Sequence, residues 1–431
     1  MLKNIKTVLY TKRSAVFYAV VVFLLTSITS SLLTVPLNIG KRYVGGHDFL
    51  PPFLYDSIVR DMSVIDTVTN NGCNTSNQVA LMVPFRLFYY FMSYFFKIDS
   101  STVTSILFFA IAFLSQLNSY NLLRYLCKKK GDTDCNLIAI VFGVMYFFCP
   151  FVVSLLIPGH MSQLFIYAFI PAIIKNLDGY LMGQHFINNN VINIFFLSLL
   201  SSASFFNYAV LFAYLLLLMV YTFVFFHSAI KLSSVFKKLL IVIVTIIMAN
   251  LWWLLPSILN VKNFGEINNS SYLNDYEEIA TKYATFNNIF IGTSDPMLHL
   301  DEAAYATYYT NDLFIITSLI FFILFIYGVI HRKDTLLLGV TLLMLFFAFL
   351  SKGSQQPFGN FFTFAYNNVF GFKMFRRPIS KFYSIYWLLF IMSSFVVYVD
   401  VNKREKSMYK TLFSFALMGV ALLNFIFFQC R

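Results

Sequence analysis

The acidic motif nearest the N-terminus is GGHDFLPP, at residues 45–52, directly after the first long apolar stretch. Its glycines allow tight backbone turns, so Asp48 could face a cavity at a membrane surface, with His47 beside it to contact a substrate. A carboxylate there could act as a general base toward an acceptor hydroxyl, or could hold a divalent metal ion. Asp56 and other acidic residues follow, so a solvated acidic loop is the alternative interpretation.

A histidine motif, PGHMSQ, occupies residues 158–163 between two apolar stretches. A histidine at a helix start near the membrane surface, here His160, can bind a phosphate or shuttle a proton. The alternative is an interfacial cap in which Gln163 hydrogen-bonds the loop. Cys149 and Pro150 precede this motif, and the proline predicts a kink in the apolar stretch that contains it.

A basic motif, GFKMFRRPISKF, occupies residues 371–382 and carries Lys373, Arg376, Arg377 and Lys381. Arginine can hold phosphate oxygens through two hydrogen bonds, and lysine adds positive charge. The motif therefore predicts a site for an anionic ligand. The alternative is that these cations contact anionic headgroups or the acidic segment 259–311.

Two adjacent tryptophans, Trp252 and Trp253, lie near the end of another apolar stretch. Such residues commonly anchor a helix at the membrane interface. They could also stack on a sugar ring, which makes them secondary candidates for substrate binding.

Several familiar signatures are missing from the sequence. It has no Walker A loop, no HExxH, no GxSxG and no dinucleotide-binding glycine pattern. We expect no span to carry the buried paired charges of an ion pathway, which argues against a pump or secondary transporter. The five cysteines show neither CxxC nor metal-ligand spacing, so they predict no disulfide framework.

The composition indicates that lipid covers much of this protein. Hydrophobic residues make up 59% of the chain and charged residues only 12%, about half the charged share of a soluble domain. The net charge of +12 could suggest nucleic acid. Basic cytoplasmic loops of a membrane protein explain that charge better, so we expect membrane lipid and no nucleic acid as partner.

About eleven stretches are long enough to cross a bilayer as helices. They are 15–35, 101–124, 136–157, 161–181, 189–206, 208–229, 238–258, 312–331, 334–350, 379–400 and 409–429. A further apolar stretch, 79–96, could span or could lie on the outer surface. We favour a surface helix, because it leaves the basic residues 124–130 on the cytoplasmic side.

This arrangement predicts one all-α polytopic membrane domain over residues 1–431, in the plasma membrane or its equivalent. The N-terminus would be cytoplasmic, because every substantial inside loop is then basic. The long outer segments 36–100, 259–311 and 351–378 would form the active-site face, with surface helices in the first of them.

The order of these motifs resembles the GT-C superfamily of membrane glycosyltransferases. The resemblance is carried by the Asp motif in the first outer loop, PGH at 158–160, WWLLP at 252–256, KG at 352–353 with PFG at 357–359, and FRRP at 375–378 followed by Lys381 and Phe382. Within that class these motifs are similar to the membrane region of the bacterial arabinofuranosyltransferase type and its relatives. Those relatives often read FRDP, so Arg377 departs from the pattern.

The resemblance implies an inverting glycosyltransferase with a polyprenyl-phosphate-linked sugar donor and a glycan, lipid or protein acceptor. Asp48 would be the acid/base residue, with Asp56 as a second candidate and a divalent cation, Mg²⁺ or Mn²⁺, held by Asp48 if the enzyme uses one. His160, Arg376, Arg377 and Lys381 would hold the departing lipid phosphate. The alternative is a non-catalytic flippase or transporter that binds the same lipid phosphate. A purely structural membrane protein would leave the basic motif unexplained.

Overall fold

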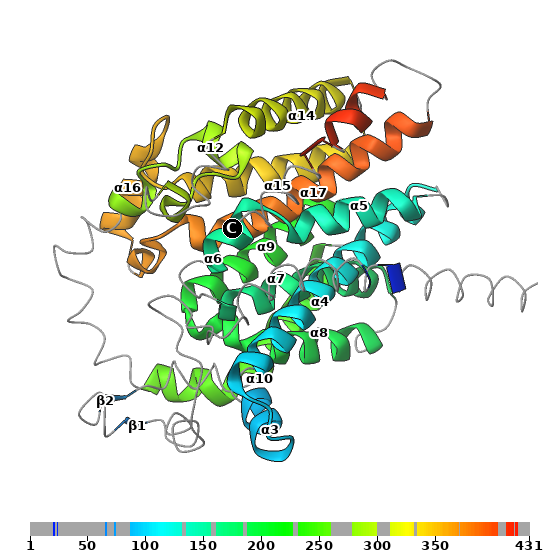
Figure 1. Ribbon diagram of the computed structural model, residues 1–431. Coiled ribbons are helices and arrows are strands. Elements are labelled where there is room, and N and C mark those ends of the chain that lie inside the picture. Colours follow the sequence, from blue (N-terminus) through cyan, green and yellow to red (C-terminus); the bar gives the residue numbers. More distant parts are fainter. Residues whose placement is uncertain are drawn as a thin grey trace, which may run out of the picture.

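The computed structural model is almost wholly helical over the residues that it describes (Figure 1). These residues are 20–21, 24, 65–66, 73–74, 87–131, 135–156, 161–183, 188–226, 232–259, 278–299, 311–331, 334–369, 371–403, 411–417 and 419–420. Strands β1 (Ile65–Asp66) and β2 (Cys73–Asn74) form a two-residue antiparallel ladder, in which Ile65 pairs with Asn74 and Asp66 with Cys73.

Eight helical segments in the described part are long and apolar enough to cross a membrane. They comprise α4 (Ser100–Lys129), α5 (Asn136–Phe147) with α6 (Pro150–Leu156), α7 (Leu164–Met182), α9 (Tyr208–Phe226), α10 (Leu232–Leu259), α14 (Asp312–His331), α15 (Thr335–Lys352) and α17 (Ile379–Lys403). Each coincides with a predicted span. The prediction of a multi-span helical membrane protein is therefore confirmed.

The predicted span 136–157 is interrupted where the sequence predicts a kink. Helix α5 ends at Phe147 and α6 begins at Pro150, since proline cannot donate the backbone hydrogen bond that would continue the first helix. The seven residues of α6 therefore form a separate short helix. This helix carries Ser154, a residue of the candidate site.

The predicted span 189–206 is two helices and not one. Helix α8 (Asn189–Leu200) is followed by the 3-10 helix η4 (Ser202–Phe206). The backbone N–H and the hydroxyl of Ser201 both donate to the carbonyl of Leu197 at the point where α8 ends. Ser204 then binds the carbonyl of Ser162, just before α7. The two helices together are about 28 Å long, close to the thickness of a bilayer core.

Three predicted segments fall wholly or partly outside the described residues. These are the first span 15–35, the last span 409–429, and the first half of 79–96. The second half of 79–96 forms α3 (Leu87–Phe95), which is nine residues or about 14 Å long. Residues 79–86 lie outside the described residues, so the surface position of the whole stretch 79–96 stays a prediction.

Helix α17 forms the centre of the bundle. Its spanning part is almost entirely buried, and it packs against α4, α5, α9, α14 and α15. Figure 1 shows it running between α15 and α5. Because polar groups inside such a core need partners, Ser393 bonds back to Leu389 within the helix, and Ser384 bonds Tyr214 of α9.

Alternating helix directions sort the connecting segments into two ends of the bundle. One end holds α6, η3 (Met161–Gln163), α12 (Phe286–Ile291), η7 (Pro296–His299), α16 (Gly359–Asn368) and η8 (Phe372–Phe375). We call it the Asp295 end; α6, α12 and α16 lie toward the left of Figure 1. The other, the Lys130 end, holds the α4–α5 turn, where Lys130 Nζ binds Asp334 at 2.5 Å and Asp400 at 2.6 Å.

A disulfide joins Cys127 to Cys135 across the α4–α5 turn at the Lys130 end. The cysteine spacing did not predict this bridge, because the two residues meet only once the chain has reversed between two helices. Disulfides persist in oxidising compartments, whereas the basic residues of the same turn predict a cytoplasmic location. The disulfide indicates a non-cytoplasmic location for the Lys130 end, and the basic residues indicate a cytoplasmic one. The orientation of the protein in the membrane therefore stays a prediction.

Candidate functional site

The basic residues of the 371–382 motif gather around the first turn of α17. Pro378 directly precedes the helix, and its carbonyl accepts the backbone N–H groups of Lys381 at 3.0 Å and Phe382 at 2.9 Å. Proline is well suited to such a start because the first N–H groups of a helix have no partner within the helix. Arg377 lies two residues before α17, and Lys381 lies in the first turn of that helix.

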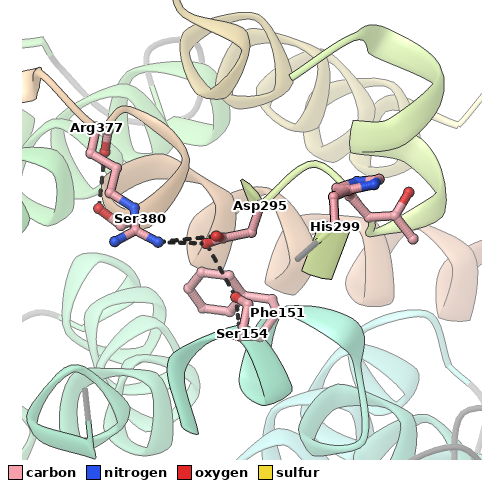
Figure 2. Close-up of polar contacts among 7 residues, drawn as sticks. Phe151, Ser154, Asp295, His299, Arg377 and Ser380 are labelled. Carbon is pink, nitrogen blue, oxygen red and sulfur yellow. Dashed lines mark hydrogen bonds and ion pairs between the residues drawn. The ribbon is translucent and has the colours of Figure 1, made fainter. Parts of the chain in front are cut away.

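Arg377 forms an ion pair with Asp295, which lies just before η7. Its Nη2 atom is 3.0 Å from Oδ1 and 3.2 Å from Oδ2 of the carboxylate. The Asp295 side chain is only 2% exposed and that of Arg377 12%. Ser154 of α6 donates from Oγ to the same carboxylate at 3.2 Å. Figure 2 shows Arg377 and Ser154 approaching Asp295 from different sides.

The loop that carries Asp295 is held at several points. Helix α12 begins at the cap Thr285 and ends at Gly292, whose φ of 101° is a left-handed conformation. A side chain at Gly292 would also press against Pro150 and the Tyr383 hydroxyl. His299, which lies apart from the ion pair in Figure 2, binds the carbonyl of Thr293 through Nε2 at 2.6 Å. These contacts fix the position of the carboxylate before any ligand binds.

Lys381 is a buried cation at the same place. The residue is 5% exposed, and within the described part of the chain its ammonium forms no hydrogen bond or ion pair. The cations Arg376 and Arg377 are its electrostatic neighbours. A buried positive charge needs an anion nearby to offset its lost hydration. This position therefore has the electrostatic character of an anion site.

Lys352, at the end of α15, is also buried but is fully engaged. Its ammonium donates to the carbonyls of Gln355 and Pro357 and lies over the rings of Phe286 and Phe349. These bonds shape the 353–359 turn. Gly359 is required in that turn, since a Cβ there would lie 1.8 Å from the Ser354 carbonyl oxygen.

The two tryptophans of α10 differ in their surroundings. Trp253 is completely buried, donates from Nε1 to Asn250 at 2.9 Å, and packs against Tyr208. No face of it is left for a sugar, so its role is in packing. Trp252 is half-buried, and its Nε1 atom is buried with no acceptor in the described part of the chain.

Gln163 lies in η3, which packs against α6 and so neighbours the element that carries Ser154. Its amide oxygen is buried, and no donor reaches it within the described ranges. Lys373 is half-buried and Arg376 exposed, and both lie between α16 and α17. The structure thus brings Gln163 and all four predicted cations to the Asp295 end.

Four predicted site residues lie outside the described residues: His47, Asp48, Asp56 and His160. Among the residues that are described, no group of three His, Cys, Asp or Glu side chains could hold a metal ion. A metal at Asp48 therefore stays a prediction.

Sequence reasoning missed Asp295 and Ser154. Asp295 stands in an ordinary S-D-P sequence within the predicted outer segment 259–311, and Ser154 lies inside an apolar stretch, so neither residue has a recognisable motif. The sequence held one sign of a missing acidic partner, namely its departure from the FRDP pattern of the related proteins. Arg377 replaces an acid in that motif, and an added cation in a buried place requires a carboxylate from elsewhere in the fold.

A second polar cluster lies near the Lys130 end, inside the bundle. Asp178 of α7 is 1% exposed and accepts from the Tyr125 hydroxyl, from Lys129 at 3.0 Å and from Tyr221 at 3.4 Å. Asp178 is thus a buried acid within a span, which the sequence analysis did not single out, whereas its partner Lys129 is exposed at the end of α4. Lys129 was assigned to a loop, but α4 continues to that residue and brings its ammonium alongside α7.

Comparison of the chain with protein-family models, with curated proteins and with solved structures found no match.

Proposed function

We propose that this protein is a membrane glycosyltransferase that transfers a sugar from a polyprenyl-phosphate-linked donor to a glycan, lipid or protein acceptor. The observation that carries the proposal is the buried Lys381, which has no anionic partner in the described part of the chain and has Arg376 and Arg377 beside it. The GT-C resemblance supplies the reaction, and the cations suit its leaving group.

In this proposal the phosphate of the donor lies against Lys381. When the bond from the anomeric carbon to the phosphate oxygen breaks, negative charge develops on the lipid phosphate, and a cation already in place stabilises that charge without reorganisation. Arg376 and His160 contribute further positive charge or hydrogen bonds. Lys373 and Gln163 would bind the remainder of the donor at the same end of the bundle.

In this proposal Arg377 has a structural role, and not the phosphate-binding role that the basic motif suggests. Because Asp295 already neutralises it, it adds less net charge to a phosphate site than Lys381 does. The pair instead ties the start of α17 to the loop before η7 and to α6, and thereby positions Lys381. Asp48 would deprotonate the acceptor hydroxyl as the hydroxyl oxygen attacks the anomeric carbon and inverts it.

The test is a transfer assay with purified protein in lipid, using a panel of radiolabelled polyprenyl-phosphate sugars and measuring release of free lipid phosphate. Lys381→Gln should lower the rate by about a hundredfold or more, the usual cost of removing one charge-stabilising donor. Lys237→Gln, at an exposed lysine of α10, is the matched control and should retain the rate. Asp48→Asn should bind the donor and transfer nothing, and full activity in that variant would defeat the assignment of the base.

The second candidate is a protein that binds or moves the same lipid without cleaving it. The ion pair between the buried Asp178 and the exposed Lys129 favours this alternative, since an acidic side chain buried inside a membrane span commonly marks a transport pathway. Movement of a labelled donor between leaflets, with no release of lipid phosphate and with loss of movement in Asp178→Asn, would support transport. Release that persists in Asp178→Asn would support the enzyme.

A further inference from the structure

Helices α4 and α7 run side by side in the same direction. Near the middle of the pair, Asn118 of α4 donates to the Ala168 carbonyl of α7 at 2.9 Å. Near the Lys130 end, Tyr125 and Lys129 of α4 both bind Asp178 of α7. These two α4 residues are four positions apart and so share one face of that helix.

The neighbouring face of α4 carries a second pair with the same spacing, Arg124 and Lys128. Both interact electrostatically with Lys175, which precedes Asp178 on α7 by three residues. Arg124 and Lys175 are half-buried, and Lys128 is exposed. The seam between the helices therefore presents one face where a lysine and a tyrosine bind an acid, and another where two cations of α4 act electrostatically on Lys175 of α7.

None of these three cations has an anionic partner in the part of the chain that the structure describes. Across the described ranges, the side chains of Arg124, Lys128 and Lys175 form no hydrogen bond and no ion pair. Their mutual repulsion opposes packing, and partial burial of two of them weakens screening by water. A bound anion would relieve both effects.

The surroundings favour the phosphate of a lipid headgroup over a soluble anion. The cluster lies in the last two turns of α4, where a spanning helix reaches headgroup level. Along the same face of α4, toward the middle of the bundle, come the half-buried apolar residues Phe113 and Leu117. An acyl chain could lie along them while its phosphate meets the cations.

We propose that Arg124, Lys128 and Lys175 form a binding site for one anionic phospholipid of the leaflet at the Lys130 end. This site is separate from the cations around α17, which lie at the opposite end of the bundle, and it does not depend on the proposed transfer reaction. The lipid phosphate would bridge α4 and α7 beside the Asp178 cluster.

The test is native mass spectrometry of the full chain in detergent, titrated with phosphatidylglycerol and, separately, with phosphatidylcholine. The native protein should retain one phosphatidylglycerol more tightly than the others and show no such preference for phosphatidylcholine. Lys128→Gln should weaken that binding about fivefold, and the triple change of Arg124, Lys128 and Lys175 to Gln on the order of a hundredfold.

Two controls make the outcome decisive. Lys237→Gln removes a comparable exposed charge from α10 and should leave the affinity unchanged; an equal loss there would show only nonspecific surface charge and overturn the proposal. Exchange of Arg124 for Lys and of the two lysines for Arg should restore binding in a folded protein. Displacement of the lipid by millimolar inorganic phosphate would overturn the choice of a lipid as ligand.

Discussion

Asp295 and Arg377 are 82 positions apart in the chain, yet their side chains meet as a buried ion pair with a shortest N–O distance of 3.0 Å. The pair joins a loop to the start of the central helix α17. Removal of one member would leave the other charge buried without its partner. The pair therefore orders the Asp295 end, whatever ligand binds there.

Arg377→Met should lower the free energy of unfolding by about 3–5 kcal/mol, because Asp295 would keep its charge in a buried place. The double change Arg377→Met with Asp295→Leu should recover most of that loss, since no buried charge remains. Thermal unfolding of the purified variants in one detergent measures both effects. Equal unfolding temperatures for the native protein and Arg377→Met would contradict the structural role.

Lys381→Met should have the opposite effect on stability. It replaces a buried lysine that has no partner in the described part of the chain with an apolar side chain of similar length, so the free energy of unfolding should rise by about 1–4 kcal/mol while donor binding is lost. Lys352→Met is the matched control. That lysine donates to two carbonyls, and its replacement should lower the unfolding temperature because those acceptors lose their donor.

From the surroundings of Asp334 we predict that the free energy of unfolding depends on pH. Burial opposes its ionisation, but the bond from Lys130 and the N–H groups of Leu337 and Leu336 outweigh this, so the pKa of Asp334 lies below its ordinary value. A lowered pKa in the folded state means that the stabilisation is fully present above the ordinary pKa, about 3.9, and is lost as the pH falls through the folded value.

The measurement for Asp334 is the unfolding temperature of the native protein and of Asp334→Asn from pH 7 to pH 3. Asparagine can still cap α15 but cannot pair with Lys130, so the change isolates the charge. The native protein should be the more stable at neutral pH, and the two curves should converge in acid. A constant difference over the whole range would show that the ion pair contributes nothing.

The orientation of the bundle can be tested with single cysteines and a membrane-impermeant thiol reagent applied to intact cells. Lys128→Cys, in a background with all five native cysteines changed to Ser, should be protected if the positive-inside rule holds. Asn360→Cys, exposed in α16 at the other end, should then be labelled. The reverse pattern would place the α4–α5 turn outside, where its disulfide would persist.

The sequence alone determined the class of this protein and the spacing of its main elements. Long apolar stretches must form helices in lipid because each unpaired backbone group costs several kcal/mol there, so eight predicted spans agree with the structure within a few residues. Pro150 predicted the break between α5 and α6, because a proline has no backbone N–H to continue the first helix. The clustering of Lys373, Arg376, Arg377 and Lys381 also followed from their nearness in the chain.

Only the tertiary structure decided what those cations contact. Asp295 meets Arg377, and Lys129 meets Asp178, because helices distant in the sequence pack against one another, and no local pattern specifies such partners. The predicted span 189–206 is divided into α8 and η4 at Ser201, which a count of apolar residues does not register. Lys352 and Lys381 look alike in the sequence. The turn that follows α15 gives Lys352 two carbonyl acceptors, those of Gln355 and Pro357. Lys381 is buried without a partner in the described part of the chain, and this difference makes it the centre of the candidate site.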